Sequence, residues 1–183
     1  VLIDNEKGGY DATAHLVSLG HKRIACISGP NDLTPSRQRV DGYLRCLKEN
    51  GIKADKGLIE MGRFDFLSGK QSMARLLALE ERPSATFVAN DMMAIGAMAA
   101  AYEAGIAVPE ELSIIGFDDI GLASVSTPAL TTMAQPIDGL AEEATRLLFA
   151  RLKKQDQNGN QRVVLDARLI KRASTAKLNG VRS

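Results

Sequence analysis

Short apolar runs alternate with helix-length amphipathic stretches along most of the chain. The runs 23–28, 85–89 and 112–117 are almost wholly apolar, which is typical of strands buried on both faces of a sheet. A further strand is predicted over 58–61. Because helix-length segments separate these strands, the pattern predicts right-handed crossovers and a doubly wound parallel sheet, that is, an α/β fold.

Turn and cap residues indicate where the intervening helices begin and end. Thr34 is predicted to cap a helix that has Pro35 in its first turn and stops at Gly51, since Pro suits a helix start and Gly a helix end. Two more helices are predicted from about Leu67 and over 91–104. These lengths fit the crossovers that a parallel sheet requires.

The pattern becomes less regular after residue 117. In order, the sequence predicts an irregular loop, or a loop with a short helical turn, over 121–130; a strand over 131–135; a long helix from Pro136; a polar stretch over 153–162; a strand within 163–170; and a frayed tail over 173–183. No internal repeat is evident in this part of the chain.

Composition narrows the classes of function. Apolar residues make up 45% of the 183 residues and the formal net charge is +1, whereas a DNA-binding surface usually needs a basic patch. No apolar run approaches the roughly 18 residues needed to span a membrane. The start at Val1 shows no signal peptide and lies within a predicted strand, so we interpret the chain as part of something longer. Cys26 and Cys46 are interpreted as buried thiols of a reducing cytoplasm, the alternative being a disulfide.

Polar and aromatic side chains follow the predicted strands. In open parallel sheets, ligands bind outside the carboxyl ends of the strands, and the residues there include Ser36, Arg37, Arg39, Phe64, Asp65, Asn90, Asp91, Asp118, Asp119 and Gln135. Arginine, amide and carboxylate groups supply directional bonds to vicinal hydroxyls, and an aromatic face suits the C–H side of a sugar ring. The sequence therefore predicts a polyol site.

Each of these residues also has a purely structural interpretation. Asn90 could cap a helix, Asp118 could form a turn, and Phe64 could belong to the core. Arg37 and Arg39, in the first turns of a helix, could simply face solvent. Their shared position on one rim of the sheet is what favours a binding site.

Enzyme motifs are not found. Gly69-Lys70 lacks the glycine five positions earlier and is followed by Gln71, so it is no phosphate-binding loop. There is no Gly-x-Gly-x-x-Gly after a strand and no Gly-x-Ser-x-Gly. His15 and His21 flank a helix end, where His21 is interpreted as part of a cationic last turn. No spacing predicts a metal site, and no cofactor is expected.

Several ordered segments resemble the lactose/galactose-repressor family. They are Asp4-Asn5, Gly8-Gly9-Tyr10, 15–24, Ser28-Gly29-Pro30, 36–43, 89–96, 115–120, 128–132 and Gln135-Pro136. The match is collinear over about residues 1–175. Segments 33–37 and 120–124 look most like the ribose-repressor branch.

The resemblance implies a type I periplasmic-binding-protein-like fold with two lobes. It implies that the chain holds the C-terminal lobe and the returning part of the N-terminal lobe: 1–21 as the end of the N-terminal lobe and crossover, 22–134 as the C-terminal lobe, 135–166 as the return, 167–175 as the strand back and 176–183 as a tail. It maps effector contacts onto Arg39, Phe64, Asn90, Asp118 and Gln135, with Arg37 added from the rim.

The function implied is that of the sensor domain of a cytoplasmic transcriptional repressor rather than an enzyme. Its expected partners are a sugar effector, a pentose above others, operator DNA through an N-terminal helix-turn-helix outside this stretch, and a second copy in a homodimer, with no membrane. The effector held between the lobes would set their closure and so control DNA binding. The alternatives are an extracytoplasmic sugar-binding protein of the same fold and a purine-responsive repressor.

Overall fold

Strands and helices alternate through the structure, as the hydrophobic pattern predicts. The computed structural model describes residues 1–153 and 161–178, so most of the predicted polar stretch and the end of the predicted tail lie outside the described residues. The elements are β1 (Leu2–Ile3), α1 (Asn5–Ser18), β2 (Ile24–Ser28), α2 (Thr34–Glu49), η1 (Lys56–Leu58), β3 (Ile59–Met61), α3 (Phe66–Leu77), β4 (Ala85–Val88), α4 (Asp91–Glu103), β5 (Ser113–Asp118), α5 (Gly121–Val125), β6 (Thr131–Ala134), α6 (Ile137–Leu152), β7 (Val164–Leu165) and β8 (Arg168–Ile170).

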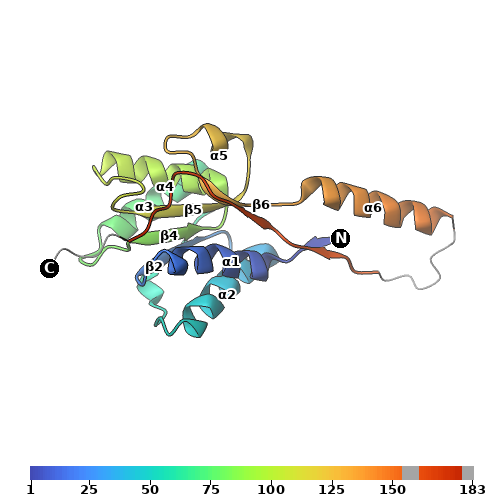
Figure 1. Cartoon of the computed structure of the whole chain (residues 1–183), viewed down its shortest axis with the longest axis horizontal. Coiled ribbons are helices and arrows are strands. Elements are labelled where there is room, and N and C mark those ends of the chain that lie inside the picture. Colours follow the sequence, from blue (N-terminus) through green and yellow to red (C-terminus); the bar gives the residue numbers. More distant parts are fainter. Residues whose placement is uncertain (154–160, 179–183) are drawn as a thin grey trace.

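A six-stranded sheet in the order β3-β2-β4-β5-β6-β8 forms the centre of the molecule. The first five strands are parallel, which confirms the predicted α/β class, whereas β8 runs antiparallel to β6 with Arg168 opposite Ala134. The chain leaves the carboxyl end of β6 through α6 and β7 and returns to that same end (Figure 1). Therefore the last strand can only run back along β6 in the opposite direction.

Helices cover both faces of this sheet, with α1 and α2 on one side and α3 and α4 on the other (Figure 1). Leu16, Tyr43 and Phe117 belong to the apolar core on the α1–α2 side. Met73 and Ile114 belong to the core on the α3–α4 side. Since β2, β4 and most of β5 are buried throughout, burial on both faces explains their continuous apolar runs.

Glycine allows the helices of each pair to approach closely. A Cβ atom on Gly42 of α2 would lie 2.0 Å from the Glu6 carbonyl oxygen of α1. On the other face, a Cβ on Gly69 of α3 would lie 2.2 Å from the Met93 carbonyl oxygen of α4. Any larger residue would push the two helix backbones apart, so these contacts fix how each pair lies on the sheet.

The predicted helix ends are partly confirmed. Gly51 and Gly105 follow α2 and α4 with positive φ, and the Ile52 and Ile106 N–H groups bond back to Leu47 and Ala101, which is the Schellman arrangement. Thr34 is not a cap: α2 already includes it and Leu33 precedes the helix without a side-chain cap bond. The Thr34 hydroxyl accepts from Arg37 instead. Of the two predictions for 121–130, the short helical turn is confirmed as α5.

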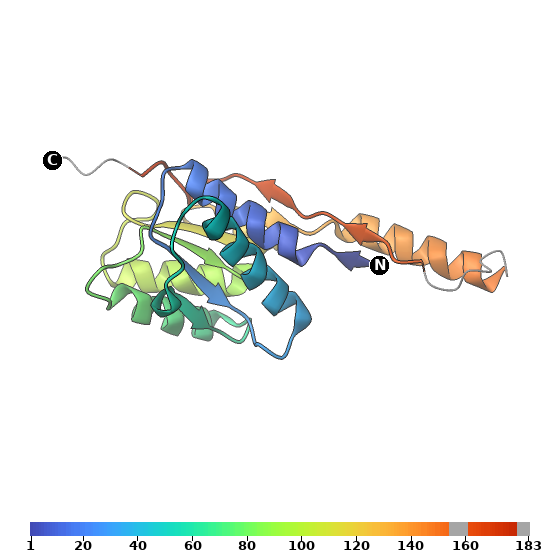
Figure 2. The same ribbon diagram turned by 90° about the horizontal axis from the view of Figure 1, so that it is seen from below.

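A second, two-stranded sheet stands apart from the six-stranded one. It pairs β1 with β7 in parallel, and α6 lies beside it with no buried residue (Figures 1 and 2). The predicted strand within 163–170 is thus two strands in different sheets. Residues 1–21 also divide between the sheets, because α1 buries Ala12 and Leu16 against the six-stranded sheet whereas the backbone of β1 pairs with β7.

The segment 173–178 docks on the main sheet, so the prediction of a frayed tail from residue 173 is wrong here. Ser174 is fully buried, and its carbonyl accepts from the Ile114 N–H at 2.8 Å. Its hydroxyl donates to the Ile114 carbonyl and accepts from the Thr131 N–H. Side-chain bonds to strand ends, which the polar sequence of this segment does not reveal, anchor it.

His21 is buried where a cationic turn was predicted. Its Nδ1 lies 2.9 Å from the Ser84 hydroxyl and its Nε2 lies 3.1 Å from the Ala176 carbonyl oxygen. Since a carbonyl can only accept, Nε2 carries the proton and Nδ1 accepts from Ser84. Burial lowers the pKa of His21. The prediction of a cation at this position is therefore wrong, and His21 is a neutral link to the docked segment.

Candidate functional site

Arg39 lies at the centre of the rim formed by the carboxyl ends of the strands. It comes from α2 and is only 6% exposed. Its Nε donates to the Asn5 side-chain oxygen at 2.9 Å and its Nη1 donates to the Ala89 carbonyl. Its Cζ lies 3.6 Å from the centroid of the Phe117 ring. Burial lowers the pKa of Arg39 to about 10, so the guanidinium keeps its charge at neutral pH.

Asp118 and Gln135 complete this cluster. The Asp118 carboxylate lies 3.6 Å from Arg39 Nη1 and accepts a hydrogen bond from the Gln135 amide nitrogen. Burial raises the pKa of Asp118, while Arg39 and Gln135 act in the opposite direction. β5 and β6 are neighbours in parallel register, which explains why residues 17 positions apart in the chain meet at one edge.

Asn90 and Phe64 lie together on the same rim. Asn90 caps α4 by accepting from the Met93 N–H at 2.9 Å, and its amide nitrogen donates to the Phe64 carbonyl at 3.1 Å. A Cβ on Gly29 would lie 2.1 Å from the Phe64 ring and 2.4 Å from the Ser36 hydroxyl. Asn90 is therefore a helix cap, as its structural interpretation predicted, and its side chain also holds the loop that carries Phe64.

The Ser36 hydroxyl is a feature that sequence reasoning listed only by position. It is buried, and it has no hydrogen-bond partner among the described residues. Buried hydroxyl groups are usually bonded. Its place beside Gly29 puts an unused polar group next to the predicted site.

Arg37 is not brought to this cluster. Its guanidinium donates to the Asn31 carbonyl at 2.8 Å and to the Thr34 hydroxyl at 3.2 Å, both in exposed surroundings. These contacts shape the loop before α2. Arg37 and Arg39 are two residues apart, so they project from different sides of the helix.

The rim also holds the non-glycine residues that have positive φ in the described part of the chain. They are Phe64 (φ 63°), Asp118 (φ 115°) and Asp119 (φ 60°). Such backbone conformations cost free energy in L-residues and persist where surrounding contacts impose them, often at functional sites. The strain therefore falls on two of the predicted site residues and on a neighbour.

Sequence reasoning missed two residues that build the site, Asn5 and Phe117, and placed a third, Asp91, at a strand end without giving it a role. Asn5 begins a helix that the apolar pattern did not delimit, and Phe117 was attributed to the core strand, where its ring in fact supports Arg39. Asp91 is fully buried; it accepts from the Ile120 N–H at 2.9 Å and from the Thr132 hydroxyl at 2.6 Å. Burial raises the pKa of Asp91 to about 6. The signals for Asp91 were its position after a predicted strand and its charge at the start of an otherwise apolar helix.

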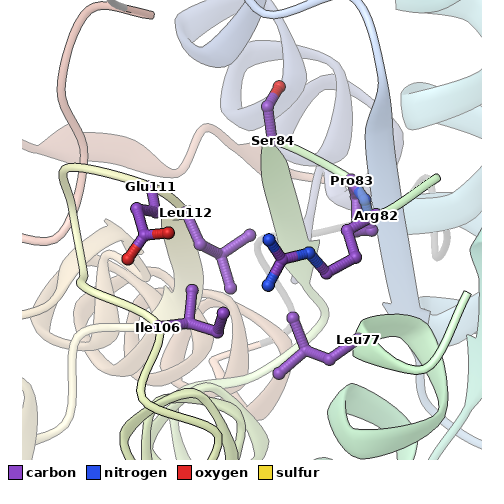
Figure 3. Close-up of a pocket in the computed structure, with 7 residues that line it drawn as sticks. All are labelled: Leu77, Arg82, Pro83, Ser84, Ile106, Glu111 and Leu112. Atoms are coloured by element: carbon purple, nitrogen blue, oxygen red, sulfur yellow. The ribbon is translucent and has the colours of Figure 1, made fainter. Parts of the chain in front are cut away.

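A pocket of about 410 Å³ lies at the opposite edge of the sheet, at the amino ends of β4 and β5 (Figure 3). The Arg82 side chain projects into it toward Leu112, and Glu111 lies on the opposite side of Leu112 (Figure 3). None of the predicted site residues lines it. The rim cluster and this pocket are thus separate features at the two ends of the strands.

Across the residues that the structure describes, no three His, Cys, Asp or Glu side chains gather closely enough to bind a metal ion. No helix among them combines the length and the apolar character of a membrane span. Cys26 and Cys46 are buried and unpaired, which agrees with the thiol interpretation. Burial raises the pKa of Cys26 to about 12, so this thiol is unreactive at neutral pH.

The amino-acid sequence matches a known domain family and several transcriptional regulators. The sequence profile of a periplasmic binding protein-like domain matches residues 13–175. The chain is 42% identical over 179 residues to the HTH-type transcriptional regulator DegA of Bacillus subtilis (strain 168), covering 98% of this chain and 52% of that protein. It is 44% identical over 167 residues to the ribose operon repressor of Escherichia coli (strain K12), covering 91% and 50%. The chain thus spans about half the length of these curated relatives.

A solved structure shows the same architecture. The transcriptional regulator CelR–cellobiose complex superimposes with a TM-score of 0.89 at 35% identity, covering 94% of this chain and 52% of that chain. The type I periplasmic-binding-protein-like fold and the family resemblance expected from the motifs are thereby confirmed.

Proposed function

Since the chain belongs to the periplasmic-binding-protein-like domain family, we propose that it is the effector-binding part of a transcriptional regulator of the lactose/galactose-repressor type. An effector held between two lobes alters their closure and thereby the DNA affinity of a helix-turn-helix outside this stretch. The relatives named as regulators and repressors support this role. They also favour it over an enzyme and over an extracytoplasmic solute-binding protein.

The single observation that carries the proposal is the cluster of buried Arg39 with the half-buried Asp118 and Gln135 on the rim. A guanidinium, a carboxylate and a carboxamide in contact offer donors and acceptors for neighbouring hydroxyl groups. Phe64 offers an aromatic face and Asn90 fixes its loop. We assign effector contacts to these five residues; Arg37, whose guanidinium binds Asn31 and Thr34 in the loop before α2, is left out of the assignment.

The effector class we propose is a sugar, a pentose above others. Support comes from the name of the ribose operon repressor and from a neighbour solved with cellobiose. The rim itself carries hydrogen-bonding groups suited to polyols. A purine is the alternative ligand, and it would stack on Phe64 rather than use the full polar cluster.

The two sheets correspond in this proposal to the two lobes. The C-terminal lobe consists of residues 22–134, of the segment 167–175 that returns to it, and of α1. The returning part of the N-terminal lobe consists of residues 135–166 and β1. The exposed side chains of Ile137, Phe149 and Leu152 on α6 would pack against the rest of that lobe.

We further propose a cytoplasmic homodimer. Apolar side chains are exposed on α3 and α5, namely Leu67 at 54%, Leu122 at 52% and Val125 at 73%. Exposed apolar residues of this size commonly mark interaction sites. A second copy is the partner expected, because two linked DNA-binding heads read two half-sites.

Calorimetry on the full-length gene product tests the function. D-ribose, cellobiose and adenine are titrated separately, and Asp118→Asn is compared with Glu103→Gln, an exposed carboxylate paired with Lys70. We expect a sugar to bind and Asp118→Asn to weaken its binding at least tenfold, since the charge is lost and one of the two acceptor oxygens becomes an amide donor. Adenine binding without sugar binding would overturn the sugar assignment. Unchanged affinity in Asp118→Asn would overturn the site.

A further inference from the structure

Arg172 joins the last part of the described chain to the rim. It lies two residues after β8, and its Nη2 contacts the Asp119 carboxylate at 2.6 Å while its Nη1 donates to the Leu130 carbonyl at 2.9 Å. Its backbone N–H donates to the Thr131 hydroxyl at 3.0 Å. The Arg172 and Asp119 side chains are only 19% and 26% exposed. The guanidinium fork therefore binds two acceptors in a partly desolvated place.

The residue that Arg172 holds is next to Asp118. Both Asp118 and Asp119 have positive φ, so the turn that aims the Asp118 carboxylate at Arg39 is strained and needs contacts that maintain it. Asp91 supplies one such contact by accepting from the Ile120 N–H. The ion pair between Arg172 and Asp119 supplies the contact on the other side of the turn.

We propose that Arg172 is a positioning residue for the effector site: by holding Asp119, it keeps Asp118 directed toward Arg39 and Gln135. The proposal rests on the proposed function in taking Asp118 as an effector contact. Arginine suits this role better than lysine, because its rigid planar fork holds two separate nitrogens in place, one for the carboxylate and one for the carbonyl, whereas lysine offers a single nitrogen on a flexible stem.

Arg172 is not required simply to anchor the docked segment. Ser174 already binds Ile114 and Thr131 through buried hydrogen bonds, and the Thr175 hydroxyl lies 3.0 Å from His15 Nε2. With these contacts in place, the segment 173–178 keeps its own attachment when the Arg172 side chain is shortened. The remaining consequence of its loss falls on the Asp118–Asp119 turn.

The test compares Arg172→Met and Arg172→Lys in the full-length gene product. The matched control is Arg75→Met, which removes another arginine–carboxylate pair, that of Arg75 Nη2 with Glu60 at 2.7 Å. Two readouts are taken: calorimetric affinity for D-ribose, and amide hydrogen exchange at Asp119 and Ile120. Melting temperatures report general destabilisation.

We expect Arg172→Met to bind D-ribose about tenfold more weakly, an effect usual for neighbours in one network. Arg172→Lys should recover part of the loss, and Arg75→Met should bind as wild type. Exchange at Asp119 and Ile120 should accelerate in Arg172→Met alone. The proposal is overturned if the Asp119 and Ile120 amides of Arg172→Met exchange at the wild-type rate. It is also overturned if wild type binds D-ribose and Arg172→Met binds it as tightly as Arg75→Met does. If wild type binds no D-ribose, local acceleration still supports the positioning role, and the sugar assignment falls instead.

Discussion

The Arg39 guanidinium is held between an aromatic ring and a carboxylate: its Cζ lies 3.6 Å from the centroid of the Phe117 ring, and its Nη1 lies 3.6 Å from Asp118 Oδ1. The ring comes from the strand that also carries Asp118 at its end. One strand thus supplies both the support and the counter-charge for the same cation. This arrangement orients the guanidinium before any ligand arrives.

Replacing Arg39 should therefore affect both stability and binding. Arg39→Met leaves the half-buried Asp118 carboxylate without its cation and should lower the free energy of unfolding by about 2 kcal/mol, less than for a fully buried pair because Asp118 is partly exposed. Effector affinity should fall by about thirtyfold or more, in the range known for buried charged partners. Urea unfolding and calorimetry measure the two effects.

Phe117→Leu provides the matched control for this prediction. It keeps an apolar side chain under Arg39 but removes the ring, so it should lose about 1 kcal/mol of cation–π attraction plus a small packing term. Equal binding losses in Phe117→Leu and Arg39→Met would contradict the view that Arg39 itself contacts the effector.

The close contact of α1 and α2 predicts a strong effect of a single methyl group. Gly42→Ala places a Cβ 2.0 Å from the Glu6 carbonyl oxygen, and such overpacking should cost about 1–3 kcal/mol. Gly121→Ala, where nothing lies within 4 Å, should change stability by less than about 0.5 kcal/mol. Thermal unfolding of both variants distinguishes the two sites, and equal melting temperatures would show that the helices can separate freely.

Removing the Ser174 hydroxyl should destabilise the protein although it lies near the end of the described chain. Ser174→Ala removes the acceptor of the Thr131 N–H and one donor to the Ile114 carbonyl. The free energy of unfolding should fall by about 1–3 kcal/mol. Ser124→Ala removes an exposed hydroxyl bonded to Gly121 and should be nearly neutral. Chemical denaturation of both variants measures the difference, and a neutral Ser174→Ala would mean that the segment is attached by other contacts.

Acid should weaken the fold through His21. Burial puts the pKa of His21 in the folded chain below its ordinary value of 6.5, so the unfolded chain binds the proton more readily. The contribution of His21 is complete above about pH 6.5 and is lost as the pH falls through the window below it. Between pH 7 and 5, wild type should lose more stability than His21→Gln.

The comparison with His21→Gln is needed because titration of Asp91 changes the free energy of unfolding in the opposite direction as the pH falls. The pKa of Asp91 is raised to about 6 from 3.8, so protonation of its buried carboxyl in that window favours the folded chain. Urea midpoints at several pH values for both proteins separate the two groups. Parallel pH profiles would contradict the prediction for His21.

Much of the fold could be predicted because burial on both faces leaves a direct mark on the sequence. The runs around Ile27, Val88 and Ile115 are apolar on both faces and became β2, β4 and β5. The direction of β8 could not be predicted in this way, because it depends on where the chain re-enters after a separate sheet. The division of 163–170 between two sheets leaves no mark on the local pattern either, because both strands are short and alike; only the family resemblance separated them, with 135–166 as the return and 167–175 as the strand back.

The site was predictable to the extent that it depends on strand ends. Arg39, Asp118 and Gln135 meet because parallel strands end at one edge, whereas Arg37 shares their sequence neighbourhood but not their direction from the helix. Asn5 and Arg172 were not predicted as site residues. Each approaches the rim from far along the chain, and only tertiary packing brings it there.

The place of β8 at one edge of the main sheet has a consequence for synthesis of the protein. A ribosome that has released the chain only as far as α6 leaves β6 as an open edge, with Thr132 and Ala134 still lacking the backbone partners that β8 later provides. Open edges of this kind can pair with other chains. The nascent chain therefore passes through an interval in which association with its neighbours competes with completion of the sheet, and this interval ends only when residues 168–178 emerge.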